Sequence, residues 1–503
     1  MILLLVIGLL AWWPMYFYQD EFVYRILNAR HIQDGSLRMG LFSLCESWLA
    51  TTPLLFHLPA WLTSWWYQSL DPLAARSAVL AVIVFFYLMT IGPKPRLASL
   101  LVLGSLVGIS GSAMLLTRPE YLQLFNIAIC LLIHWHSQSA RHPISKTGRI
   151  LYSVVLFLSF ILALYSHQQA VLFLPLNLYA LHGLLRHHRH TLYVFSAALI
   201  ITSASGLYYK QSDLSCENNR ALSIELASYQ HRLNELPAII FSPDILEKSY
   251  RYTSQFIYKE RYPVNLLPGT KLSSPLLALN LLIILTVLLT LLMGIGLCVR
   301  ATYQLASQRL FKRASALPAH HLLSLLIAGP AIALLLVNTG QHFYRCIFIH
   351  TLITAALSLY FVNREGPPSR GCMLLLLMLI PAFVGSTWFN YQSIRPALAQ
   401  GYVGSGAAMS SMMQKRHVMT NSCKLDIAHG HLLVDAVTYE QLKHVPRLYP
   451  IEYLMFQNRK TGVPIETIVE GMDMQGWVGV CPGDNDQGRF CCGKFTAPSE
   501  LDR

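Results

Sequence analysis

Two adjacent carboxylates, Asp20 and Glu21, follow directly after a strongly apolar N-terminal run. Residues 1–18 contain no charged side chain, and the run ends in a cluster of Trp, Tyr and Phe. Because such rings prefer the boundary between membrane and water, the pattern predicts a membrane helix that ends near Tyr18. A carboxylate held at that level could act as a general base on a water-soluble acceptor while a second substrate stays anchored by a lipid tail. The alternative is that the two acids only mark the end of the helix.

Composition predicts a membrane protein with many helices. The 503 residues are 54% hydrophobic and 13% charged, with a mean hydropathy of +0.44. Several apolar runs approach or exceed the roughly 18 residues that a helix needs to cross the hydrocarbon core. The apolar segment 48–70 is interrupted by Pro53, His57 and Pro59, so we expect it to lie along the interface. We interpret eleven runs as spans: 1–18, 74–92, 97–116, 121–135, 150–165, 170–185, 191–208, 275–299, 318–339, 346–362 and 372–391.

The charge distribution predicts the orientation of these spans. With the N-terminus inside, the inner loops hold 13 Lys and Arg and one acid, whereas the large outer segments hold 22 basic and 23 acidic residues. This asymmetry is the positive-inside rule, so the net charge of +13 indicates orientation and not binding to nucleic acid. Every large hydrophilic segment is then outside, including the Asp20–Glu21 pair.

Two outer segments are large enough to carry structure of their own. Residues 209–273 form an outer loop, and residues 392–503 form a tail long enough for a small mixed α/β domain. The tail carries four cysteines, at Cys423, Cys481, Cys491 and Cys492. An even number of cysteines in an exported segment favours two disulfides over a zinc site, with the pairing left open.

Four segments, taken in order, resemble the pattern of the GT-C membrane glycosyltransferases. They are Asp20-Glu21 with its amphipathic continuation to Leu37, the interfacial stretch Thr52–Trp61, the segment Thr117-Arg118-Pro119-Glu120-Tyr121-Leu122, and Tyr165–Pro175. The first resembles the outer loop of the lipid A aminoarabinose transferases and the protein O-mannosyltransferases. The match covers about the first 185 residues. It implies an enzyme that takes a sugar from a polyprenyl-phosphate carrier on the outer face of the membrane.

The resemblance also implies roles for the acids. Asp20 would be the general base that deprotonates the acceptor hydroxyl, and Glu21 would position the acceptor, coordinate a metal or fix the loop. Arg118 and Glu120 would face the same cavity, with Pro119 stiffening the approach to the next span. Relatives have Asp where this chain has Glu120. The resemblance therefore assigns no metal-binding role to Glu120, and the use of a divalent metal is left open.

The departing lipid phosphate needs cations on the outer side. Arg345, in the segment that also holds His342 and Tyr344, sits at the outer end of two spans, where a guanidinium can grip phosphate through two hydrogen bonds. The alternative is an arginine that marks a helix end. His167 occupies the place of a lysine in relatives and could bind phosphate when protonated. His57 of the interfacial segment completes the expected substrate-binding residues.

The sequence therefore predicts an all-α polytopic domain over residues 1–391, GT-C-like with about eleven spans and outer interfacial helices, followed by a periplasmic domain over 392–503. We expect a glycosyltransferase of the bacterial inner membrane that acts on a glycan, lipid or protein acceptor and contacts membrane lipids. The alternatives are a transporter, a lipid-scaffolding protein, or a ligase that uses a diphosphate-linked glycan. A transporter should show internal pseudo-symmetry and polar or broken spans near the midplane.

Overall fold

A computed structural model describes residues 72–92, 120–138, 144–166, 168–212, 274–311, 319–337 and 343–362. It also describes short strands between residues 419 and 494 and the isolated positions 373, 377, 381, 463 and 467. Nearly all of the helical residues, with positions 373, 377 and 381, belong to one compact unit of the chain, and the strands belong to another.

Helices make up the first unit. They are α5 (Pro72–Ile91), α7 (Glu120–Gln138), α8 (Lys146–Ser166), the 3₁₀ helix η3 (Gln168–Phe173), α9 (Leu174–Leu185), α10 (Arg189–Ser212), α14 (Ser274–Phe311), α15 (Ala319–Val337) and α16 (Phe343–Val362). These helices coincide with eight of the eleven predicted spans. The predicted spans 1–18 and 97–116 lie outside the described residues, and 372–391 is described only at three helical positions.

Four of these helices contain segments long and apolar enough to cross a membrane. The segments are Lys146–Leu164, Arg189–Leu207, Leu281–Ser307 and Ala319–Leu336. The described part of the chain is therefore that of a multi-pass helical membrane protein. Helix α14 continues to Phe311, well past the predicted end of its span at residue 299. Its 38 residues are about 57 Å long at 1.5 Å per residue, so it exceeds the roughly 30 Å of the hydrocarbon core.

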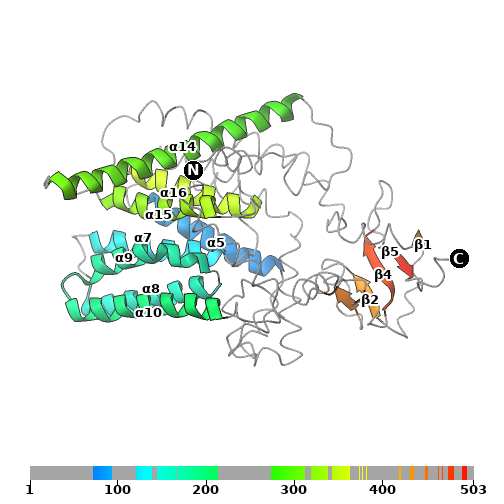
Figure 1. Cartoon of the computed structure of the whole chain (residues 1–503), viewed down its shortest axis with the longest axis horizontal. Helices are drawn as coiled ribbons and strands as arrows, with labels where there is room; N and C mark the ends of the chain where they lie inside the picture. The colour runs from blue at the N-terminus through cyan, green and yellow to red at the C-terminus, as the bar shows by residue number, and fades with distance from the viewer. Residues whose placement is uncertain are drawn as a thin grey trace. The chain divides into compact units, whose positions relative to one another are not determined.

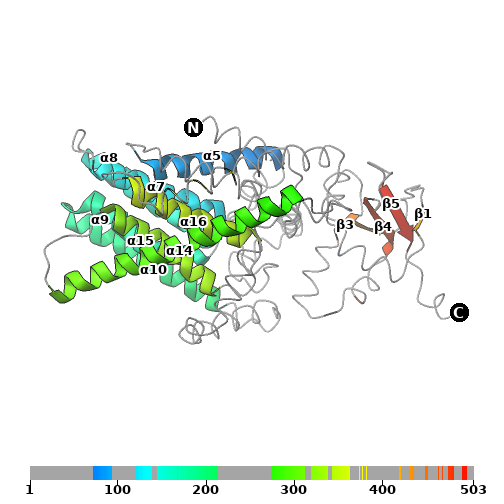
Figure 2. The ribbon, with the colours of Figure 1, turned by 90° about the horizontal axis from the view of Figure 1, so that it is seen from above.

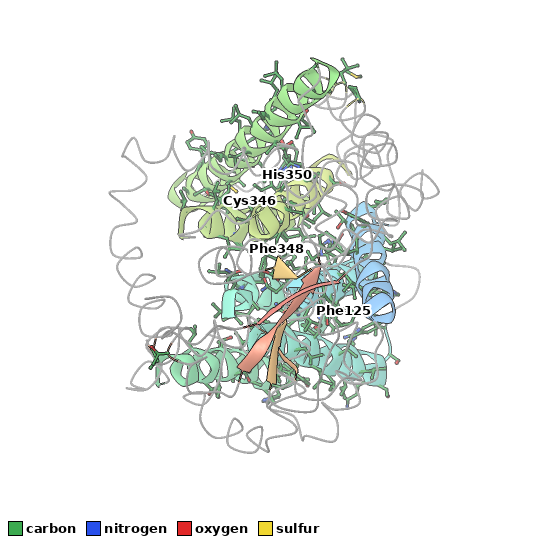
Figure 3. The ribbon with its side chains drawn as sticks, turned by 90° about the vertical axis from the view of Figure 1, so that its right-hand side faces the viewer. Phe125, Cys346, Phe348 and His350 are labelled. Carbon is green, nitrogen blue, oxygen red and sulfur yellow. The ribbon has the colours of Figure 1, made fainter. Side chains whose placement is uncertain are left out.

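The helices pack in two neighbouring groups (Figures 1 and 2). Helix α7 packs against α8 and α9, while α14, α15 and α16 pack against one another, and α15 also contacts η3 and α9. Helix α16 is buried at every position from Cys346 to Leu359, which include Phe348 and His350, both labelled in Figure 3. Over these residues α16 therefore has no exposed face.

Large apolar side chains are exposed on three of the outer helices. They are Ile150, Leu151, Val154 and Leu158 on α8; Tyr193, Val194, Ile200, Ile201 and Leu207 on α10; and Leu281, Leu285, Leu292, Ile295, Val299 and Tyr303 on α14. In water such faces would be unfavourable, whereas hydrocarbon tails solvate them at no cost. These faces fit contact with lipid.

Two glycines allow close approaches between helices. Gly92 follows α5 with φ of 70°, and a Cβ placed there would lie 2.9 Å from the Trp135 ring of α7. A Cβ on Gly294 of α14 would lie 2.6 Å from Cγ2 of Ile353 on α16. Both contacts need a residue without a side chain.

The strands of the second unit form one mixed sheet. They are β1 (Met419–Thr420), β2 (His431–Val434), β3 (Leu448–Pro450), β4 (Met474–Val480) and β5 (Phe490–Lys494), in the spatial order β1-β5-β4-β2-β3. Strand β2 pairs in parallel with β3 and β4, and β5 pairs antiparallel with β4 and β1. Cys491 and Cys492 lie in β5, whereas Cys423 and Cys481 lie outside the described residues. The disulfides stay a prediction.

Candidate functional site

One side of α7 carries five buried polar or titratable side chains, which we call the polar face of α7: Glu120, Gln123, Asn126, Cys130 and His134. At 3.6 residues per turn these positions fall within about a third of the helix circumference. The face runs along most of the helix, and its members are at most 7% exposed. Burying a polar group is costly unless the group forms hydrogen bonds, so the partners of each one indicate what the face does.

An amide cluster, consisting of Asn126, Ser159 and Asn177, joins the polar face to α8 and α9. The Asn126 amide nitrogen donates to Ser159 Oγ and to Asn177 Oδ1, each at 3.0 Å. Asn177 Nδ2 donates to Asn126 Oδ1 at 3.0 Å, and Cys130 Sγ donates to Asn177 Oδ1 at 3.4 Å. Hydrogen bonds of this kind hold helices together where the hydrophobic effect between them is absent.

The amide cluster is closed. An asparagine amide offers two N–H donors and one carbonyl oxygen. Asn126 uses both donors and its oxygen within the cluster, and Asn177 uses its second donor on the carbonyl oxygen of Phe173, at 2.9 Å. Ser159 donates to the carbonyl oxygen of Leu156 on its own helix. The cluster therefore has no unmet donor that would call for a ligand.

The contact with Phe173 marks a change of helix type in the predicted span 170–185. The six residues of η3 are 3₁₀-helical, and α9 begins at Leu174 with Pro175 in its first turn. Proline has no N–H to donate, which suits it to the first turn of an α-helix better than to later positions. The 3₁₀ segment rises about 2.0 Å per residue, so η3 and α9 together extend about 30 Å despite having only 18 residues.

Gln123 lies one turn before Asn126 and differs from it in its hydrogen bonding. Its side chain is 1% exposed. Within the part of the chain that the structure describes, neither its amide nitrogen nor its amide oxygen forms a hydrogen bond. Leaving a buried donor or acceptor unmet costs about 1–3 kcal/mol, so such a group in a native protein needs a partner.

Glu120 is the first residue of α7 and is 7% exposed. The positive end of the helix dipole favours a carboxylate at this position. An acidic side chain buried among membrane helices is costly and is usually functional. Along α7, about 9 Å separates Glu120 from Asn126, so the acid, Gln123 and the amide cluster succeed one another from the helix start inward.

The other end of the bundle gathers histidines and aromatic rings. His134 stacks on Tyr179 of α9, with ring centres 5.8 Å apart, and His320 of α15 is close enough to interact with it electrostatically. His321 of α15 stacks on Tyr360 of α16 at 4.5 Å. These contacts join the end of α7, the start of α15 and the end of α16, which the predicted topology places on one side of the membrane.

Of the predicted site residues, the structure describes the side chain of Glu120. Tyr344 and Arg345 are in the first turn of α16, where the backbone is described. The remaining predicted residues lie outside the described residues: Asp20, Glu21, His57, Arg118, His167 and His342. The arrangement of all of them around one cavity therefore stays a prediction.

Neither the amide cluster nor Gln123 was predicted from the sequence. A signal was present, because Gln123 and Asn126 stand three residues apart within the mostly apolar predicted span 121–135. Among the described helices, no three His, Cys, Asp or Glu side chains come together in a way that could hold a metal ion.

No protein-family model, curated protein or solved structure matches this chain. Any functional conclusion therefore depends on the residues of the chain itself.

Proposed function

We propose that this protein is a membrane glycosyltransferase. It would move a sugar from a polyprenyl-phosphate carrier to a glycan, lipid or protein acceptor on the outer face of the membrane. The observation that carries the proposal is the burial of Glu120 at the start of α7. This acid belongs to the segment Arg118-Pro119-Glu120, which resembles a site segment of the GT-C enzymes.

The charge pattern supports an outer site. The bias of Lys and Arg toward the inner loops puts the start of α7 outside, together with Asp20 and Glu21. The carrier phosphate would sit at the same level, because its polyprenyl tail stays in the hydrocarbon. A carboxylate at the outer surface of the membrane would be accessible to an acceptor that approaches from water.

In the proposed reaction, the Asp20 carboxylate accepts the proton of the acceptor hydroxyl, and the acceptor oxygen bonds to the anomeric carbon of the sugar. The bond between that carbon and the phosphate oxygen breaks, and the electron pair leaves with the lipid phosphate. Arg345, in the first turn of α16, would balance the added negative charge. The proton on Asp20 then returns to water.

A transporter is the second candidate, and one observation favours it. The 3₁₀-to-α change at Phe173–Leu174 lies beside the buried amide cluster, and α15 contains Pro330. Broken helices next to buried polar groups are a feature of transporter binding sites. The cluster uses its donors internally, which fits helix association at least as well as solute binding.

The deciding experiment is sugar transfer from polyprenyl-phosphate hexoses in membranes that contain the protein. The unaltered chain should transfer sugar, and Asp20→Asn should abolish transfer at an unchanged protein level, because an amide cannot accept the proton. Glu120→Gln and Arg118→Ala should impair turnover. If the unaltered chain transfers no sugar but moves a solute across sealed vesicles, the transporter takes its place.

A further inference from the structure

We propose that Gln123 is a specificity residue, whose amide binds a hydroxyl group of the transferred sugar. This inference rests on the proposed function and adds to it the part of the substrate that the polar face of α7 recognises. Its basis is the contrast between two amides on the same face of one helix.

Asn126 and Gln123 are equally buried, each 1% exposed, and one turn apart. All donors and the acceptor of the Asn126 amide are used by Ser159 and Asn177. Both polar atoms of the Gln123 amide lack a hydrogen bond within the described helices. The hydrogen bonds of Asn126 are therefore accounted for by the packing of the helices. Gln123, in contrast, needs a partner with both a hydrogen-bond donor and an acceptor.

A sugar hydroxyl is such a partner, because it donates one hydrogen bond and accepts others. Lipid tails offer neither, and a phosphate offers mainly acceptors. Gln123 also lies between Glu120 and the amide cluster, which places it next to the acid that the proposed function puts at the site. A neutral amide beside a carboxylate suits recognition of an uncharged, hydroxyl-rich ring more than binding of the anionic phosphate.

A site that is built to bind a hydroxyl discriminates strongly against ligands without it, because its own polar atoms are then left unmet. Gln123 should therefore contribute to binding of the sugar and not of the lipid carrier. Two probes separate these contributions: polyprenyl phosphate, and polyprenyl phosphate bearing glucose, mannose or galactose.

The test measures binding of both probes to the purified full-length protein in lipid nanodiscs. The unaltered protein should bind its preferred polyprenyl-phosphate hexose more tightly than polyprenyl phosphate. Gln123→Met, which keeps the shape and removes the polar atoms, should reduce this preference about tenfold and leave the affinity for polyprenyl phosphate unchanged. Gln138→Met, at an exposed glutamine of the same helix, is the matched control and should change neither affinity.

Gln123→Asn serves as the second variant if Gln123→Met does not fold. It keeps an amide, but the side chain is one methylene shorter, so the amide no longer reaches the same position. It should also lose the preference. An unchanged preference in the folded variants would overturn the inference and leave the proposed function standing, since Gln123 would then bind water or another part of the chain. If the unaltered protein shows no preference for any hexose-bearing lipid, the proposed function fails and the inference fails with it.

Discussion

Asn126 and Asn177 exchange amide hydrogen bonds in both directions between α7 and α9, and both donor–acceptor distances are 3.0 Å. A reciprocal pair of this kind fixes the height of one helix against the other, because sliding either helix breaks both bonds. The pair also fixes the 3₁₀-to-α junction, since Asn177 donates its second N–H to the carbonyl oxygen of Phe173.

We therefore expect Asn126→Leu to destabilise the protein. The change leaves one Asn177 N–H group without its partner, and the Asn177 carbonyl oxygen keeps only the weak Cys130 thiol as its donor on α7. We expect a cost of about 1–3 kcal/mol in the free energy of unfolding. Interhelical hydrogen bonds in membranes average nearer 0.6 kcal/mol, which makes the lower half of that range the better expectation. Denaturant unfolding in detergent micelles measures the effect.

Ser203→Ala is the control for this change. The Ser203 hydroxyl is buried and donates to the carbonyl oxygen of Leu199 on its own helix, so its loss removes a hydrogen bond without uncoupling two helices. It should cost less than Asn126→Leu. Equal losses for the two variants would show that the amide pair contributes nothing special to the packing of α7 on α9.

A second prediction compares two glycines in α14. Gly294→Ala should destabilise by about 1–3 kcal/mol, because its Cβ would lie 2.6 Å from Cγ2 of Ile353, and a β-branched side chain on a helix cannot rotate away freely. Gly296→Ala is the matched control, since a Cβ there meets nothing within 4 Å. It should be neutral or slightly stabilising. The same unfolding measurement distinguishes them, and a stable Gly294→Ala variant would contradict the close packing of α14 on α16.

The sequence predicted the helices well because their signal is local. The absence of charge over a long run is enough to predict a segment such as α15, and the bounds of α16 differ from the prediction by three residues at the start and agree at the end. The end of α14 was predicted too early, because Arg300 was taken as the end of the span, whereas a helix can continue into water beyond the hydrocarbon core.

The buried contacts were not predictable in the same way, because they depend on which helices are neighbours. Asn126 and Asn177 are 51 residues apart in sequence, and nothing in either segment indicates the other. Gln123 and Asn126 form the same pattern in the sequence, and only the burial and hydrogen bonds of the folded chain distinguish the two amides. The role of Glu120 was expected from its segment, and its burial is the part that the structure adds.

A third prediction concerns orientation. Reporter fusions after residues 145, 240 and 450 should place the first inside and the other two outside, because the inner loops carry 13 of the basic residues and one acid. Paired reporters that are active on opposite sides of the membrane give the readout. An inner position for residue 450 would remove the basis of the proposed function.

A fourth prediction concerns the cysteines of the tail. Cys423, Cys481, Cys491 and Cys492 should be mostly oxidised, because an exported segment meets an oxidising compartment. A disulfide between the adjacent residues Cys491 and Cys492 would close a strained ring, so each should pair with one of the other two. Mass spectrometry of the unreduced protein tests both statements. Four free thiols would contradict the first, and a vicinal disulfide the second.

The last prediction concerns the phosphate contact of the proposed reaction. Arg345→Ala should weaken binding of the sugar donor by the value of a charge-assisted hydrogen bond, about 1.5–3 kcal/mol, because the guanidinium at the start of α16 would no longer meet the phosphate. The KM for the polyprenyl-phosphate donor should rise more than kcat falls. Arg300→Ala, on α14 where the predicted span ends on the inner side, is the control for a general effect of removing an arginine from the membrane boundary. If both variants change KM equally, Arg345 anchors its helix in the membrane and another cation meets the phosphate.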